Sequence, residues 1–236
     1  MHPFGQTRSV RRSDYLLQTP DTFVRAPLPG MRGATAIVHA APAIGAKFTQ
    51  YTVEVESGGS ISPTPDQRFL YVLEGSVTVA GVTLRTGDYA WSPPGFDAAI
   101  KASETARVTV IEKPYCPLQG IACPPFFTGQ ESSLAPTLLA GDPWLEVRSL
   151  IPAKPSFDIA VNTMTFQPGA TLPMVEIHVM EHGLLMLDGN GIYRLGDNWH
   201  PVAPGDFIWM APYLPQWFGA LGKTTARYLI YKDWNR

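Results

Sequence analysis

The chain carries two copies of one strand-and-turn pattern. In each copy an apolar run ends in an acid–glycine turn, a short alternating run follows, and a Gly-Asp turn leads into an aromatic strand and a proline. Acid–glycine turns between alternating apolar runs are signals of β-hairpins. We therefore predict two β-structures with one layout. The matching segments are 69–79, 84–95 and 106–111 in the first half and 184–195, 202–212 and 226–231 in the second.

The composition favours an all-β architecture. The 236 residues include 23 prolines and 21 glycines, which break helices and favour short strands joined by tight turns. Hydrophobic residues make up 45% of the chain, so a packed core is expected rather than disorder.

Charge and targeting features exclude several classes of partner. Only 16% of the residues are charged and the formal net charge is −2, so we expect no binding to nucleic acid or anionic lipid. The first twelve residues lack the apolar core of a secretory signal, and no run reaches the ~18 apolar residues of a membrane span. We interpret Cys116 and Cys123 as reduced thiols of a cytoplasmic protein, with a disulfide across their loop as the alternative.

A candidate metal site lies in the segment 176–182. If this segment is one β-strand, alternation places Glu176, His178 and His182 on the same face. Turns at Pro168-Gly169 and Asp188-Gly189 frame the strand. The alternative is that these side chains only decorate a solvated strand face.

Together with Gln216, the cluster offers two imidazoles, one carboxylate and one amide carbonyl, without a thiolate. Such a set favours Mn²⁺, Fe²⁺ or Co²⁺ over a structural zinc ion. Four protein ligands leave two positions of an octahedral ion open, so we expect a site for catalysis or binding.

The layout resembles the cupin superfamily of small jelly-roll barrels, and the duplication resembles a bicupin. In the usual cupin motifs this chain has glutamate for the first histidine, histidine for the glutamate and glutamine for the last histidine. These exchanges argue against a generic oxalate oxidase or dioxygenase. The motif positions are Gly169, Glu176, His178, His182 and Gly189, then Gly205, Pro212 and Gln216.

The exchanges resemble the (S)-ureidoglycine aminohydrolase family, bicupins of purine and allantoin breakdown. The resemblance spans nearly the whole chain and is densest from residue 174 to the end. It implies Mn²⁺ as cofactor and hydrolytic release of ammonia from (S)-ureidoglycine, giving (S)-ureidoglycolate. Its specific marks are the segments 176–183, 191–199, 208–212, 215–218 and 227–233.

The resemblance also implies roles for residues around the ligands. Lys232 is expected to pair with the substrate carboxylate, and a buried lysine can also pass a proton. Tyr193 and Tyr228 are expected to donate hydroxyl hydrogen bonds to substrate, with ordinary barrel packing as the alternative. The resemblance supports this role better for Tyr193, which is expected to be catalytic together with Lys232 and Glu176. Glu176 is expected to assist proton transfer through an oxygen that does not bind metal. Apolar walls are expected from Trp209, Trp217 and Phe218.

We expect three regions. Residues 1–120 form an N-terminal cupin barrel with an N-terminal arm, 121–150 a proline-rich connection, and 151–236 the C-terminal cupin with the active site. The stretch 62–69 contains no histidine, so the first barrel is predicted to be metal-free and structural. His39 is interpreted as a hydrogen-bonded structural residue.

We expect a homo-oligomer, because the long connecting segment can wrap around a neighbour. Two other functions stay open at this point. One is a metal-dependent cupin oxidoreductase, either a dioxygenase or an oxalate-active enzyme. The other is a non-catalytic cupin that binds a small ligand.

Overall fold

The computed structural model describes residues 7–234, which fall into two compact units. The unit that we call the first barrel comprises residues 24–134 and 150–158. The second barrel comprises 7–23, 135–149 and 159–234 of the described chain. Within residues 7–234 there is no α-helix, only short 3-10 turns at Pro20–Thr22, Pro42–Ile44, Glu131–Ser133 and Leu139–Gly141. None of these turns is long enough to cross a membrane.

One antiparallel sheet forms the first barrel. Its order is β12-β9-β6-β11-β5-β10-β7-β8, and β4 pairs with both β5 and β3. Alternate residues of these strands, such as Val53, Val72 and Val108, fill the barrel core. The strands are β3 (Arg25–Ala26), β4 (Met31–Ala40), β5 (Thr49–Ile61), β6 (Gln67–Glu74), β7 (Ser76–Val79), β8 (Val82–Arg85), β9 (Asp88–Ser92), β10 (Ile100–Lys101), β11 (Ala106–Lys113) and β12 (Phe127–Gln130).

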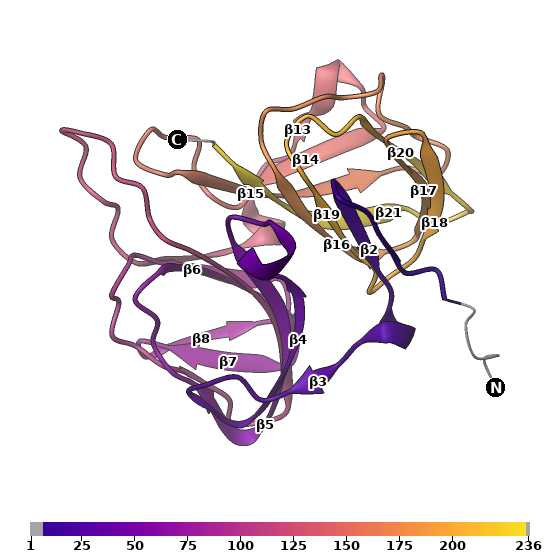
Figure 1. The fold of residues 1–236 in the computed structure, drawn as a ribbon. Helices are drawn as coiled ribbons and strands as arrows, with labels where there is room; N and C mark the ends of the chain where they lie inside the picture. The colour runs from indigo at the N-terminus through magenta and orange to yellow at the C-terminus, as the bar shows by residue number, and fades with distance from the viewer. Residues whose placement is uncertain (1–6, 235–236) are drawn as a thin grey trace. The chain divides into compact units, whose positions relative to one another are not determined.

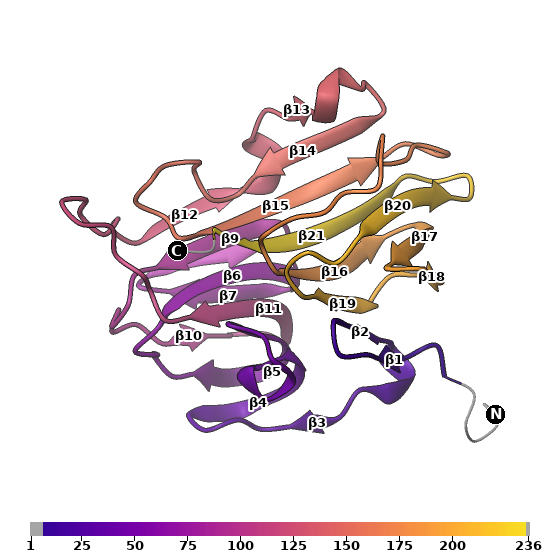
Figure 2. The same ribbon diagram turned by 45° about the horizontal axis from the view of Figure 1, so that its top comes forward.

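Two sheets form the second barrel. The larger has the order β1-β2-β19-β16-β21-β15-β14-β13, and the smaller has the order β18-β17-β20. Figure 2 shows β15 between β14 and β21. The strands are β1 (Val10–Arg11), β2 (Tyr15–Gln18), β13 (Thr137–Leu138), β14 (Leu145–Ser149), β15 (Ile159–Phe166), β16 (His182–Asp188), β17 (Asn190–Leu195), β18 (Asn198–Val202), β19 (Phe207–Met210), β20 (Gln216–Leu221) and β21 (Ala226–Asp233).

The predicted duplication is confirmed strand by strand, since β6 to β9 and β11 have the same order and pairing as β16 to β19 and β21. Even the turns match. Gly75 and Gly189 both have positive φ, 72° and 67°. A Cβ on either would lie within 2.4 Å of the carbonyl oxygen of Thr105 or 2.2 Å of that of Thr225, respectively. Only glycine fits these two close approaches.

The two compact units differ from the expected domain boundaries in the N-terminal arm and in the segment between the barrels. The N-terminal arm belongs to the second barrel, where β2 pairs with β19 (Figure 1) and Leu17 joins the core. Arg8 holds the arm with two hydrogen bonds to the fully buried carboxylate of Asp206. Residues 150–158 belong to the first barrel, and the expected connection 121–150 supplies strands to both units.

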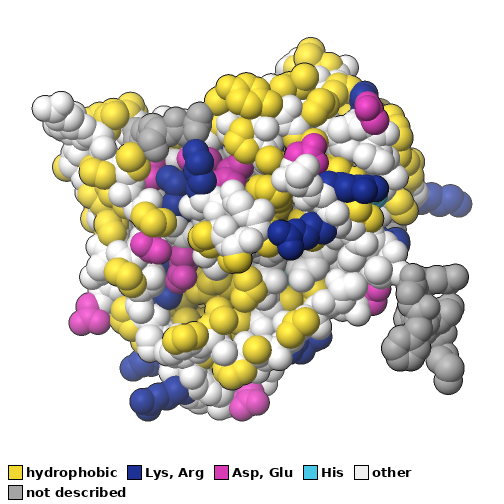
Figure 3. All heavy atoms as spheres, in the orientation of Figure 1, with side chains coloured by type: hydrophobic (Ala, Val, Ile, Leu, Met, Phe, Trp, Pro, Cys, Tyr) yellow, Lys and Arg dark blue, Asp and Glu magenta, His cyan; other side chains and the backbone are white. Residues whose placement is uncertain are grey.

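The structure also tests the predictions for His39 and the two cysteines. His39 is buried and its Nε2 lies 2.8 Å from Thr52 Oγ1, which confirms a structural histidine. Cys116 and Cys123 are free thiols. On the face drawn in Figure 3, Lys and Arg side chains and Asp and Glu side chains both occur among hydrophobic ones.

Candidate metal centre and active site

The segment 176–182 is not the single strand that the sequence pattern predicted. Only His182 lies in a strand, at the start of β16. Glu176 instead forms an isolated bridge with Gln216 at the start of β20, and the carbonyl of His178 accepts a hydrogen bond from the backbone of Tyr213. The segment therefore crosses from the smaller sheet to the larger one, which no straight strand can do. The ligand candidates come from this crossing rather than from shared strand parity.

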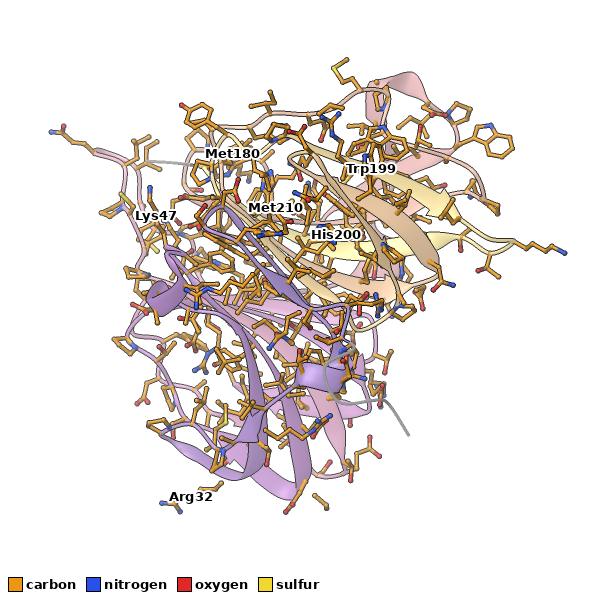
Figure 4. All side chains as sticks on the ribbon, turned by 45° about the vertical axis from the view of Figure 1, so that its right-hand side comes forward. Arg32, Lys47, Met180, Trp199, His200 and Met210 are labelled. Carbon is orange, nitrogen blue, oxygen red and sulfur yellow. The ribbon has the colours of Figure 1, made fainter. Side chains whose placement is uncertain are left out.

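His182 lies in a row of side chains across the interior of the second barrel. On neighbouring strands, Lys232 and Met210 are directly opposite His182. The same parity includes the core residues Leu184 and Ile230, so these side chains point inward. Directly opposite residues have Cβ atoms about 5 Å apart. Lys232 therefore stands beside His182, as the predicted site requires, whereas Met210 (Figure 4) was not anticipated.

Glu176 and His178 touch each other at the site. Glu176 Oε2 lies 3.1 Å from His178 Nε2. The rings of His178 and His182 are 5.2 Å apart between centroids and tilted by 70°. Both Glu176 and His178 are partly exposed, whereas His182 is 2% exposed. The cluster thus has one buried imidazole and an accessible acid–imidazole pair.

The side chain of Gln216 is hydrogen-bonded to that of Tyr193. The Tyr193 hydroxyl donates to Gln216 Oε1 at 3.0 Å, and both residues are buried. Burial, followed by the charge of Glu176, raises the pKa of Tyr193, so its hydroxyl stays protonated and remains a donor. Tyr228 and Phe218 pack with Tyr193 in one aromatic group below the cluster. Burial raises the pKa of Tyr228 as well.

The donor set suits a metal ion, although it is not preassembled. Among residues 7–234 no three His, Cys, Asp or Glu side chains stand ready to hold a metal, and His178 and Glu176 contact each other. Over the same described range, neither ring nitrogen of the buried His182 has a hydrogen-bond partner. A buried imidazole without a partner is costly. Coordination of a metal ion would satisfy one of the two ring nitrogens of His182.

The electrostatics of the site follow from burial. Burial lowers the pKa of His182 to about 3, and the charges of Lys232 and His178 act in the same direction. His182 is therefore neutral, as a metal ligand must be. Burial also lowers the pKa of Lys232, while the carboxylate of Glu176 opposes this shift. Lys232 and Glu176 thus interact inside one site.

The expected apolar walls are only partly correct. Trp209 points away from the barrel interior, because its neighbours Ile208 and Met210 belong to the core, and its Nε1 donates to Glu181 at 3.1 Å. The expectation for Trp209 was wrong because strand alternation turns it outward. Phe218 is a core residue, and Trp217 packs against the core with Nε1 bonded to the Leu172 carbonyl.

The first barrel carries a different residue at the position equivalent to His182. Arg68 of β6 lies opposite Glu112 of β11, the register that His182 and Lys232 have in the second barrel. Arg68 Nε donates to Glu112 Oε1 at 2.7 Å, and the Tyr51 hydroxyl donates to the same oxygen at 3.0 Å. A paired guanidinium is no metal ligand, which supports the prediction of a metal-free first barrel.

Comparisons with known proteins agree with this architecture. Residues 162–231 match the family model of a cupin domain, and residues 44–115 match that of an EutQ-like cupin domain. The (S)-ureidoglycine aminohydrolase of Arabidopsis thaliana is 40% identical over 239 residues, covering 98% of this chain and 80% of the plant protein. The (S)-ureidoglycine aminohydrolase of Escherichia coli is 31% identical, covering 96% and 91%. The crystal structure of protein Ylba from E. coli has a TM-score of 0.85 at 29% identity, covering 98% and 95%.

Proposed function

Because the chain belongs to the (S)-ureidoglycine aminohydrolase family, we propose that it is a hydrolase that releases ammonia from (S)-ureidoglycine and yields (S)-ureidoglycolate. The bond between the α-carbon and its amine breaks, a bond to the oxygen of water forms, and the ureido group stays intact. The observation that carries this proposal is identity of 40% across 98% of the chain. The grouping of an acid, two histidines, an amide and a lysine in the second barrel supports it.

We assign the cofactor by the donor set. Glu176, His178, His182 and Gln216 would hold Mn²⁺, with a carboxylate, two imidazoles and an amide oxygen as donors. When bound there, Mn²⁺ supplies a Lewis acid with open positions for a chelating substrate. The unpartnered nitrogens of His182 support this assignment.

Lys232 orients the substrate. Its ammonium lies on the interior face beside His182 and interacts with Glu176. A carboxylate entering the barrel would find its cation there. Ammonia loss from a carbon bearing two nitrogens passes easily through an imine-like state, whose carbon water can attack from either face. Fixing the carboxylate leaves only one of these faces open to water. Positioning then decides the stereochemistry.

Tyr193 and Tyr228 support the site from below. The single hydrogen bond of Tyr193 to Gln216 makes Tyr193 a residue that positions Gln216 rather than one that binds the substrate. Tyr228 lies in the same buried group, close enough to Glu176 for the carboxylate charge to affect its pKa. The carboxylate of Glu176, which is partly exposed, is placed to move a proton between water and the departing amine.

The stereochemical role of Lys232 has a direct test. Lys232→Ala should retain Mn²⁺ but produce a mixture of ureidoglycolate enantiomers, because the carboxylate is no longer fixed. Products would be separated by chiral chromatography from freshly generated substrate. Full retention of the S preference in this variant would contradict the orienting role.

The activity itself is tested by ammonia release from freshly generated ureidoglycine, with Mn²⁺, without it and after chelation. Activity should need the metal, and His178→Ala should abolish it. His200→Ala is the matched histidine control, because His200 lies on β18 and contacts Tyr15 instead of the ligands (Figure 4). Absence of stimulation by any divalent ion would remove the proposal. Oxygen uptake would favour a cupin oxidoreductase, and binding without turnover would favour a ligand-binding cupin.

We also propose a homo-oligomer in the cytoplasm. The free thiols Cys116 and Cys123 support a reducing compartment. Light scattering coupled to size exclusion tests the oligomer, and cell fractionation tests the location.

A further inference from the structure

Asn162 is a polar residue on the inner face of β15 in the second barrel. Met164 and Phe166, at the same parity of the strand, belong to the barrel core. Alternation therefore directs the Asn162 side chain inward as well. Unlike these neighbours, Asn162 is only partly buried. Its side-chain amide has no hydrogen-bond partner in the part of the chain that the structure describes, so it is open to a molecule that enters the barrel.

Asn162 lies next to the proposed substrate cation. Strand β15 pairs with β21 so that Ala160 is opposite Lys232 and Asn162 is opposite Ile230. Asn162 and Lys232 are thus diagonal neighbours on one face, about 7 Å apart and within reach of a common ligand. Asn162 is also one step further along the barrel than His182, which is opposite Lys232 on the other side.

The first barrel shows which side chain can occupy the position equivalent to Asn162. Its register places Tyr51 where the second barrel has Asn162, and Glu112 where it has Lys232. Tyr51 closes that barrel by donating its hydroxyl to Glu112. In the second barrel the shorter asparagine makes no such bond to Lys232. The amide of Asn162 is therefore left for a ligand.

We propose that Asn162 recognises the ureido group of the substrate, an inference that rests on the proposed function. A side-chain amide offers one carbonyl acceptor and two N–H donors. A ureido group offers the complementary N–H donors and carbonyl acceptor, so the two form a pair of parallel hydrogen bonds. With the substrate carboxylate at Lys232, the ureido group extends from it toward Asn162. Asn162 thereby selects ureido acids over other amino acid derivatives.

The test uses two unreactive ligands on the Mn²⁺-loaded protein. N-carbamoylglycine keeps the carboxylate and ureido group but lacks the amine that leaves, whereas N-acetylglycine has a methyl group in place of the terminal amide nitrogen. By calorimetry, the unmodified protein should bind N-carbamoylglycine about tenfold more tightly, because N-acetylglycine keeps the carbonyl acceptor but lacks the N–H donor and leaves the Asn162 carbonyl unpaired. Asn162→Ala should bring this ratio close to one.

Kinetics give a second readout. Asn162→Ala should raise KM for ureidoglycine by a similar factor, with a much smaller change in kcat, because the ureido group does not react. Asn162→Asp should behave alike, since a carboxylate cannot donate to the ureido carbonyl. Asn198→Ala, on the exposed part of β18, is the matched control and should keep the ratio. Asn162→Ser replaces the alanine variant if the latter fails to fold.

The outcomes separate the two proposals. If the unmodified protein releases no ammonia from ureidoglycine, the proposed function fails. If it does release ammonia and Asn162→Ala retains both the ligand ratio and KM, only the role of Asn162 is refuted.

Discussion

If the second barrel holds Mn²⁺ as proposed, the hydrogen bond between Tyr193 and Gln216 should affect its affinity for the ion. A carbonyl oxygen has two lone pairs, so Gln216 Oε1 can accept from Tyr193 and still face a metal ion. The hydroxyl also fixes the orientation of the Gln216 amide, because it bonds to the oxygen rather than to the nitrogen. Tyr193→Phe removes that bond but keeps the packing of the ring against Phe218.

The size of the effect follows from burial. Gln216 is 3% exposed, so water does not readily replace the lost hydroxyl. A buried hydrogen bond of this kind contributes about 1.4 kcal/mol, which corresponds to about a tenfold change in an equilibrium constant. We therefore expect the Kd for Mn²⁺ to rise about tenfold in Tyr193→Phe, in the range found for partners that orient metal ligands.

The assay is a titration of the chelator-treated protein with Mn²⁺, followed by electron paramagnetic resonance of the free ion. Tyr228→Phe is the control, because it removes a hydroxyl from the same aromatic group without touching Gln216. It should leave the Kd for Mn²⁺ unchanged. An unaltered Kd in Tyr193→Phe, or an equal rise in both variants, would refute the reasoning. Equal unfolding midpoints would show that the fold is intact.

Two further predictions concern the first barrel. Burial, with a smaller contribution from Arg107, lowers the pKa of His39 to about 3. The unfolded chain therefore binds this proton more readily, and stability that is complete above about pH 6.5 is lost as the pH falls toward the folded-state pKa. His39→Gln should remove about 1.4 kcal/mol of the stability difference between about pH 7.5 and about pH 5.5, measured by urea unfolding; an unchanged difference would contradict it. Arg68→Ala should cost about 3 kcal/mol, because Glu112 stays largely buried without its cation, whereas Arg68→Met combined with Glu112→Met should cost much less. Similar losses in both variants would show that packing, and not the ion pair, is responsible.

The two barrels could be predicted from the sequence because residues adjacent in the chain determine their turns. Gly75 and Gly189 sit at equal distances from their strands, and both approach a neighbouring backbone closely. The arm was assigned to the wrong barrel in the expected division because its attachment is not local. Leu17 joins a core, and Arg8 reaches a carboxylate, about two hundred residues later in the chain. No periodicity within residues 7–23 marks that partner.

The ligand cluster shows the same limit at a finer scale. Residue types and spacing singled out Glu176, His178 and His182 as candidate ligands, but the inferred geometry, one strand face, was wrong. The true arrangement depends on backbone bonds from Glu176 to Gln216 and from Tyr213 to His178. Those bonds join segments about forty residues apart. The local sequence therefore identifies the candidate donor residues but not the backbone pairing that brings them together.

The duplication gives the site an internal reference. At equivalent positions the first barrel has Tyr51, Arg68 and Glu112, whose side chains satisfy one another, and the second has Asn162, His182 and Lys232, whose side chains do not. A buried polar group without a partner weakens a fold. Asn162, His182 and Lys232 lie in a row where a ureido group, a metal ion and a carboxylate would each supply a partner. At these three equivalent positions the barrels therefore differ in whether the polar side chains pair with one another, and substrate binding should stabilise the second barrel more than the first.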